Sequence, residues 1–87
     1  MQFNIVIAPE ARRNLKKLHG AIRRRIADAI DGLADDPRPP GAVKLAGVAG
    51  PLWRIRVGDH RIIYQIEDER LIILILRVGH RRDVYRK

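Results

Sequence analysis

The stretch LWRIRVGDHRIIYQIEDERLIILILRV, residues Leu52–Val78, decides the fold of this 87-residue chain. Its first segment, Leu52–Val57, alternates apolar and basic residues, which is typical of a β-strand with one buried face. Two further apolar segments, Arg61–Glu67 and Leu71–Val78, follow after the short turns GD and DER. The stretch therefore predicts three consecutive antiparallel strands. The last strand is apolar on both faces, so we expect it to be central in the sheet or covered on both sides.

The residues before this stretch predict one more strand and two helices. Phe3–Ala8 is short and rich in β-branched residues, as strands are. Apolar residues recur at helical spacing in Pro9–Gly20 and again in Ile22–Leu33, and the three prolines of residues 35–41 end the second helix. We expect one α+β domain over residues 1–87, in the order β-α-α-β-β-β. The N-terminal helical hairpin should pack on one face of a largely antiparallel, twisted sheet.

Composition favours a polyanionic partner. The chain has 18 Lys and Arg against 10 Asp and Glu, a net charge of +8. Such a domain is drawn to nucleic acid, acidic proteins or anionic lipid, with nucleic acid the leading interpretation, and a cationic surface kept for solubility is the alternative. Without cysteine there is no disulfide or thiolate chemistry, and three scattered histidines have no metal-ligand spacing. The apolar run Leu71–Leu76 is too short for a bilayer, and the N-terminus lacks a signal peptide, so we expect a cytoplasmic protein without a membrane partner.

The predicted sheet should carry a cluster of arginines on one surface. If the apolar residues of the first strand face the helices, Arg54 and Arg56 point the other way. If side chains alternate in the same way along the next two strands, without a bulge, Arg61, Arg77 and Arg81 lie on that surface as well. Like charges side by side on a sheet repel unless an anion lies between them, and guanidinium groups bind two phosphate oxygens at once. We therefore predict a phosphate-binding surface; ordinary solvated arginines are the alternative.

The segment Lys44–Lys87 resembles the RelE toxins of the RelE/ParE toxin–antitoxin superfamily. The shared features are KL.G before the first hairpin strand, W.I.VGD.RIIY.I.D across the hairpin and RVGHR..VY at the end. The resemblance implies a toxin that is a ribosome-dependent endoribonuclease, an mRNA interferase that cleaves mRNA in the A site through the RNA's own 2′-hydroxyl. It implies no metal and no cofactor. Its implied partners are a small cognate antitoxin with an acidic or amphipathic segment, the ribosome with mRNA, and operator DNA only as the toxin–antitoxin complex.

The resemblance also implies the site residues. The implied catalytic residues are Arg54, Arg56, Arg61, Arg81 and Tyr85. Arg81 would protonate or hydrogen-bond the leaving 5′-oxygen, and Tyr85 would stack on a base or orient the ribose. Packing of Tyr85 against the sheet edge is the alternative. The expected further RNA contacts are Lys44, Arg77 and Arg82.

The chain departs from the family at the basic pair of the first hairpin strand. Family members often carry lysine there, whereas Arg54 and Arg56 stay protonated and cannot easily accept the 2′-proton. Catalysis would then be chiefly electrostatic and positional, or His80 or His60 would carry the proton. The alternation of side chains along a strand argues against this role for both histidines, since the neighbours of the predicted surface arginines point away from that surface unless a turn or bulge redirects them. A turn or edge role is their alternative.

Two other functions fit the same sequence. A ParE-like relative would share the fold and inhibit DNA gyrase without nuclease activity. A non-catalytic basic module would bind nucleic acid with an affinity that falls steeply with salt. The basic residues of the two helices would contact the antitoxin or ribosomal RNA, or would be solvated faces without a partner.

Overall fold

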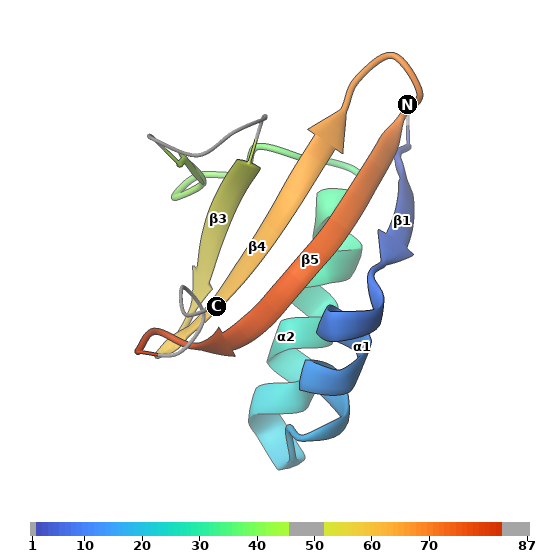
Figure 1. Ribbon diagram of the computed structural model, residues 1–87. Helices are drawn as coiled ribbons and strands as arrows, with labels where there is room; N and C mark the ends of the chain where they lie inside the picture. Colours follow the sequence, from blue (N-terminus) through green and yellow to red (C-terminus); the bar gives the residue numbers. More distant parts are fainter. Residues whose placement is uncertain (1, 46–51, 83–87) are drawn as a thin grey trace.

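The computed structural model of the chain describes residues 2–45 and 52–82. The elements, labelled in Figure 1, are β1 (Asn4–Ile7), α1 (Pro9–Lys16), α2 (Gly20–Leu33), β2 (Val43–Lys44), β3 (Leu52–Val57), β4 (His60–Glu67) and β5 (Ile72–His80). The strands form one five-stranded sheet in the order β1-β5-β4-β3-β2. The α+β class and the predicted order of elements are confirmed, and the two-residue strand β2 is an addition to them.

The sheet is antiparallel except at one edge. β3, β4 and β5 follow one another as antiparallel hairpins, and β1 pairs with β5 in parallel, with Asn4 opposite Ile72. The tight turn between β3 and β4 contains Gly58 at φ +60°, a conformation that suits glycine. β5 therefore has a strand on each side, which agrees with its two apolar faces.

A one-residue bulge in β5 changes the predicted alternation. Ile63 of β4 lies opposite Arg77, but its neighbour Tyr64 lies opposite Ile75, so Leu76 is the extra residue. A count without the bulge places Ile73 and Ile75 on the same face as Arg77. With the bulge, both isoleucines turn to the core, where they are fully buried, and Arg77 stays on the other face. The bulge thus lets one strand fill the core and still present an arginine.

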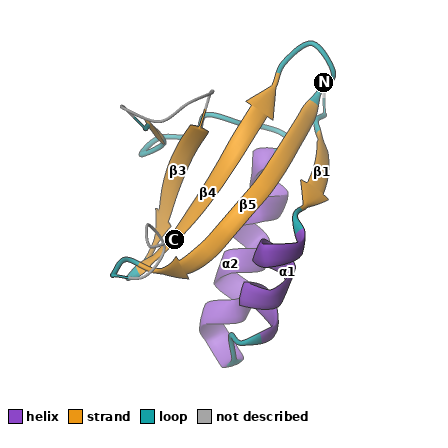
Figure 2. Ribbon diagram, in the orientation of Figure 1, coloured by secondary structure: helices purple, strands orange, loops and turns teal. Residues whose placement is uncertain are grey.

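The core lies between α2 and one face of the sheet (Figure 2). α2 contributes Ile26, Ile30 and Leu33, the apolar stripe that its sequence predicts. The buried residues of this core are Ala11, Ile26, Ile30, Leu33, Ile55, Val57, Ile62, Tyr64, Ile66, Ile73, Ile75 and Val78. Neither helix in the described part of the chain has the length and apolar character needed to span a membrane.

α1 covers the edge of β5 beyond the end of β1 (Figure 1). The Ala8 N–H donates to the Ile75 carbonyl oxygen at 2.8 Å, and the Val78 N–H donates to Oδ1 of Asn14 at 3.0 Å. The Asn14 side chain thus takes the place of a strand partner on an otherwise open edge. α1 ends at Lys16, earlier than the predicted end near Gly20, and Gly20 begins α2.

The segment after α2 is held against the sheet by a buried tyrosine. The Tyr64 hydroxyl donates a hydrogen bond to the Pro37 carbonyl oxygen at 2.8 Å, and the Tyr64 side chain is fully buried. Burial raises the pKa of Tyr64 to about 12. Nearby, Nη2 of Arg38 lies 3.0 Å from Oδ2 of Asp68 in an ion pair. The guanidinium carbon of Arg38 lies over the Trp53 ring, 5.2 Å from its centroid.

Raising the pH from about 10 to about 12 should lower the free energy of unfolding by about 2 kcal/mol through Tyr64. The folded-state pKa of about 12 exceeds the unfolded value of 10.0, so over this interval the folded chain keeps a proton that the unfolded chain loses. Urea titrations of the wild type and Tyr64→Phe at both ends of this range measure the loss. The variant should start about 1 kcal/mol less stable, because it lacks the hydrogen bond. It should then lose less stability with pH than the wild type, and equal losses would contradict the assignment.

Candidate functional site

Four arginines from three neighbouring strands lie on the sheet face opposite to the core. Arg56 of β3 lies directly opposite Arg61 of β4. Arg54 of β3 lies opposite Ile63, and Ile63 lies opposite Arg77 of β5. We call this surface, made by Arg54, Arg56, Arg61 and Arg77, the arginine face. Strand alternation predicted these four residues and Arg81 on one surface. The strand register brings the four together, whereas Arg81 lies just after β5, beyond the paired residues.

The centre of the arginine face is apolar. Ile63 is only 6% exposed although it lies on the face away from the main core. It sits between Arg54 and Arg77 in the cross-strand row. An apolar floor lowers the local dielectric constant, so charged groups beside it interact more strongly with an anion than they would in water.

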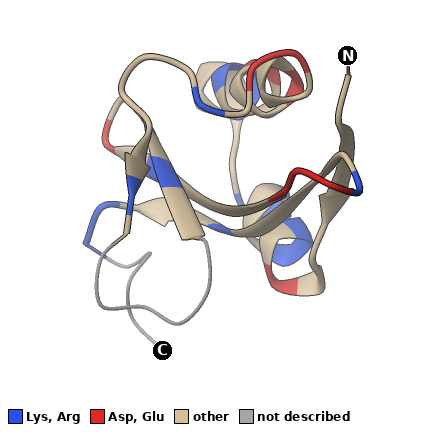
Figure 3. Ribbon diagram, turned by 90° about the horizontal axis from the view of Figure 1, so that it is seen from above, with Lys and Arg blue, Asp and Glu red and all other residues tan. Residues whose placement is uncertain are grey.

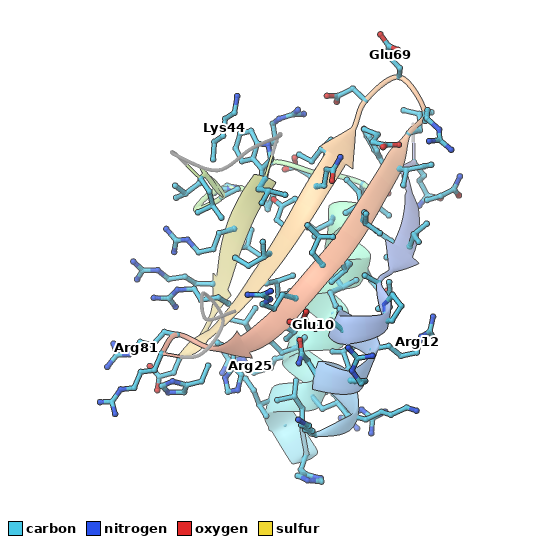
Figure 4. All side chains as sticks on the ribbon, viewed as in Figure 1. Glu10, Arg12, Arg25, Lys44, Glu69 and Arg81 are labelled. Carbon is cyan, nitrogen blue, oxygen red and sulfur yellow. The ribbon has the colours of Figure 1, made fainter. Side chains whose placement is uncertain are left out.

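The charges on the arginine face are only partly compensated. Arg56 and Arg61 are cross-strand neighbours of like charge, which destabilises the pairing. Arg77 is bound by Glu10 of α1, with 2.7 Å from Nε to Oε2. Figure 4 shows Glu10 on α1 beside β5, and this packing lets a helix carboxylate reach the face. The pairing energy of Arg77 is modest, because both side chains are partly exposed.

Arg54 carries a buried donor with no acceptor. Among the described residues, its Nε is the buried side-chain nitrogen or oxygen atom that has no hydrogen-bond partner. A buried polar group left unsatisfied costs about 1 to 3 kcal/mol. The atom is closed to solvent, so an anion would reach this N–H only after a shift of the Arg54 side chain, and the contact would then recover that free energy.

Arg81 and Arg82 lie at the end of the sheet, just after β5. The Arg81 N–H donates to the Asp59 carbonyl oxygen at 2.8 Å, which places Arg81 beside the β3–β4 turn (Figure 4). Both side chains are exposed. Tyr85, the remaining residue of the implied catalytic set, lies outside the described residues.

Lys44 does not share the arginine face. Lys44 of β2 pairs with Trp53, so the two side chains belong to the core-facing side of the sheet. Its neighbour Val43 lies opposite Arg54 instead. Figure 4 shows Lys44 at the end of the sheet away from Arg81. Of the three expected further RNA contacts, the register thus brings only Arg77 onto the arginine face, and Arg82 adjoins it at the sheet end.

His60 and His80 lie together on the core-facing side, as strand parity predicts. They are register partners, and their rings meet edge to face with centroids 5.9 Å apart. With Asn14 and Lys17 of α1 they line a hollow of about 250 Å³. Neither imidazole joins the arginine face. Within residues 2–45 and 52–82, no three His, Asp or Glu side chains gather in a way that would hold a metal ion.

The structure brings two helix residues to this site that were not among the predicted site residues. Glu10 of α1 binds Arg77, and the basic residues of the helices, Arg25 among them, were expected only to contact an antitoxin or RNA or to be solvated. Arg25 of α2 reaches the β3–β4 turn, with Nη1 3.6 Å from the position that a Cβ on Gly58 would take. Figure 4 shows Arg25 at the same end of the sheet as Arg81. Both contacts join segments that are distant in sequence, so helical or strand periodicity carried no signal for them.

A groove of about 600 Å³ follows the outer edge of β3. In the described part of the chain, β2 pairs only with Trp53 and Arg54, which leaves the later part of β3 facing the groove. The groove is lined by Ala29, Gly32, Pro39, Pro40, Gly41, Val43, Arg54, Ile55 and Arg56. Arg54 and Arg56 therefore belong both to the arginine face and to the lining of this largely apolar groove.

Basic residues occur on the helices as well as on the strands (Figure 3). The exposed cations of the helical hairpin are Arg12, Arg13, Lys16, Lys17, Arg23, Arg24 and Arg25. The positive charge therefore surrounds the fold, and the arginine face differs from the rest by its cross-strand geometry rather than by charge alone.

The sequence matches a family described as "ParE toxin of type II toxin-antitoxin system, parDE" over residues 5–85. A protein named Toxin RelG from Mycobacterium tuberculosis is 34% identical over 88 residues, which cover 100% of both chains. The archaeal RelE–RelB complex from Pyrococcus horikoshii contains a chain with 30% identity and a TM-score of 0.82, covering 97% of this chain and 100% of that one. The toxin–antitoxin complex RelBE2 of M. tuberculosis gives 28% identity and a TM-score of 0.80, covering 92% and 99%.

Replacing Arg61 by Gln should weaken binding of a single-stranded RNA oligonucleotide by about 5- to 10-fold, because one phosphate contact is lost. The slope of log affinity against log salt concentration should fall in magnitude by about 0.7 for the same reason. Fluorescence anisotropy over a range of salt concentrations measures both quantities. Arg70→Gln is the matched control, since Arg70 is exposed and pairs with Glu67 in the distant β4–β5 turn. Equal effects of the two substitutions would show that only total charge matters.

Proposed function

This chain belongs to the RelE/ParE family of toxins from type II toxin–antitoxin systems, and we propose that it is a RelE-type member, a ribosome-dependent mRNA endonuclease that cuts in the A site and stops translation. The observation that carries the proposal is the arginine face. Arg56 and Arg61 face each other without a carboxylate in the described residues, and Arg54 holds a buried N–H without an acceptor. An RNA phosphate would relieve both costs.

In the proposed reaction, the bonds that form and break lie within the RNA itself, and the ribosome holds the mRNA in the A site. The 2′-oxygen attacks the adjacent phosphorus, the bond from phosphorus to the 5′-oxygen breaks, and the products are a 2′,3′-cyclic phosphate and a 5′-hydroxyl. The 2′-oxygen loses its proton and the 5′-oxygen gains one. Negative charge builds on the phosphorane oxygens, where the guanidinium groups of Arg54, Arg56 and Arg61 would stabilise it. The apolar floor at Ile63 strengthens this stabilisation.

Arg81 and Tyr85 complete the proposed set. Arg81 would hydrogen-bond or protonate the leaving 5′-oxygen, and its place at the end of the arginine face suits a contact on the far side of the phosphate. Tyr85 would stack on a base or orient the ribose. Further contacts to mRNA come from Arg77 and Arg82, and Lys44 would contact RNA beyond the face.

In this proposal no side chain acts as a general base. Guanidinium groups stay protonated at neutral pH, and His60 and His80 lie on the other side of the sheet from Arg61. We therefore assign catalysis to electrostatic stabilisation and positioning, and the 2′-proton leaves to solvent. The reaction gains most from preorganised charge, which this fold supplies from rigid strands.

We propose a small cognate antitoxin as the inhibitory partner. The related chains from Pyrococcus horikoshii and M. tuberculosis were solved as toxin–antitoxin complexes, the former named RelE–RelB and the latter RelBE2. An acidic or amphipathic antitoxin segment would complement the net charge of +8. The complex of the two proteins, rather than the toxin alone, would bind operator DNA.

A second function is favoured by the family description itself, which names ParE. A ParE-like protein would inhibit DNA gyrase by binding it and would cut no RNA. A gyrase supercoiling assay with the purified chain separates the two activities. Inhibition of supercoiling together with intact mRNA would favour this second function.

The nuclease proposal predicts that Arg81→Gln lowers the single-turnover rate of mRNA cleavage on programmed ribosomes by about 100-fold, because the leaving oxygen loses its charged partner. Primer extension maps the cut sites, and end analysis should find the 2′,3′-cyclic phosphate and the 5′-hydroxyl.

Arg70→Gln, which removes one guanidinium far from the arginine face, should cleave at the wild-type rate. A folded Arg81→Gln protein with undiminished cleavage would remove Arg81 from the site. A wild-type chain that leaves ribosome-bound mRNA uncut would overturn the nuclease proposal as a whole.

A further inference from the structure

His80 forms a hydrogen bond that strand geometry alone does not require. Its Nδ1 accepts the N–H of Arg82 at 3.2 Å, two residues further along the chain. The imidazole therefore closes a turn over residues 80–82 in the way that an Asx side chain closes a turn onto the amide two residues on. The His80 ring is held in place by its edge-to-face contact with His60, with centroids 5.9 Å apart.

This turn fixes the backbone on both sides of Arg81. The amide of Arg81 itself donates to the Asp59 carbonyl oxygen at 2.8 Å. The next amide, that of Arg82, donates to the imidazole of His80. The Arg81 side chain is exposed, and no hydrogen bond or ion pair holds it within the described residues. Its direction therefore depends on the backbone conformation of this turn.

We propose that His80 is a positioning residue, whose imidazole holds the 80–82 turn so that Arg81 projects toward the end of the arginine face. This inference rests on the proposed nuclease function. An imidazole nitrogen accepts a hydrogen bond only when it carries no proton, so the ring acts as the neutral tautomer with its proton on Nε2. In this role His80 acts through Arg81 and does not touch the RNA.

The surroundings of the ring fit a positioning role better than proton transfer. His80 lies on the core-facing side of β5 and lines the 250 Å³ hollow. The titratable groups that share this hollow are Glu10 and Lys17 of α1, His60 of β4 and Arg77 of β5. The register places the ring on the opposite side of the sheet from Arg61, while Arg77 reaches the same hollow at the edge of β5 through its pair with Glu10. The ring therefore does not adjoin the phosphate position proposed between the arginines of β3 and β4.

The test compares His80→Asn with His80→Ala. Asn Oδ1 and His Nδ1 are both bonded to Cγ, so Asn keeps an acceptor for the Arg82 amide but has no titratable group. We expect His80→Ala to slow single-turnover cleavage of ribosome-bound mRNA by about 10-fold or more, and His80→Asn to stay within about 3-fold of the wild type. The exchange of the Arg82 amide with deuterium, followed by NMR, should be about 10-fold faster in His80→Ala and nearly unchanged in His80→Asn.

His19→Ala is the matched control, since His19 is exposed before α2 and makes no capping bond with its side chain. It should change neither rate. If His80→Asn is as slow as His80→Ala while its Arg82 amide stays protected, a proton-transfer role would replace the positioning role. Unchanged exchange in His80→Ala would also overturn the inference. A wild type that protects the Arg82 amide but cuts no RNA would instead refute the nuclease function on which the inference rests.

Discussion

The pairing register of β3, β4 and β5 is the constraint on which the rest of the structure depends. One cross-strand row joins Ile55, Ile62 and Val78 under α2, and the adjacent row joins Arg54, Ile63 and Arg77 on the opposite face. A slip of one residue would exchange these rows and bury the guanidinium groups. The burial of the isoleucine row therefore fixes where the arginines lie, and core packing and charge geometry are two consequences of the same pairing.

The arginine face places like charges on neighbouring strands, and the fold compensates only one of them directly. Glu10 binds Arg77, whereas Arg56 and Arg61 have no ion pair in the described part of the chain. The unsatisfied Nε of Arg54 adds a further cost in the free protein. Such a surface is less stable empty than occupied by an anion, and rigid strands keep the charges from moving apart. Binding of a polyanion would remove the repulsion between these arginines, and the free energy recovered would add to the affinity.

The two helices do different work in this fold. α2 closes the core, and its Arg25 reaches the β3–β4 turn at the end of the sheet. α1 covers the edge of β5 through Asn14 and carries Glu10 to the arginine face. Within the described residues, β2 pairs with the outer edge of β3 only at Trp53 and Arg54, and the groove follows the rest of that edge.

The sequence by itself determined the class of the fold, the limits of β3, the apolar stripe of α2 and the grouping of Arg54, Arg56 and Arg61. These features follow from periods of 2 and 3.6 residues, which are set by local backbone geometry. Only the tertiary structure decided where alternation breaks and which distant groups meet. The bulge at Leu76 arises from pairing between two strands, and the Glu10–Arg77 contact arises from packing of a helix on a strand edge. Such contacts depend on the free energy of the whole packed chain, and a local sequence pattern does not predict them.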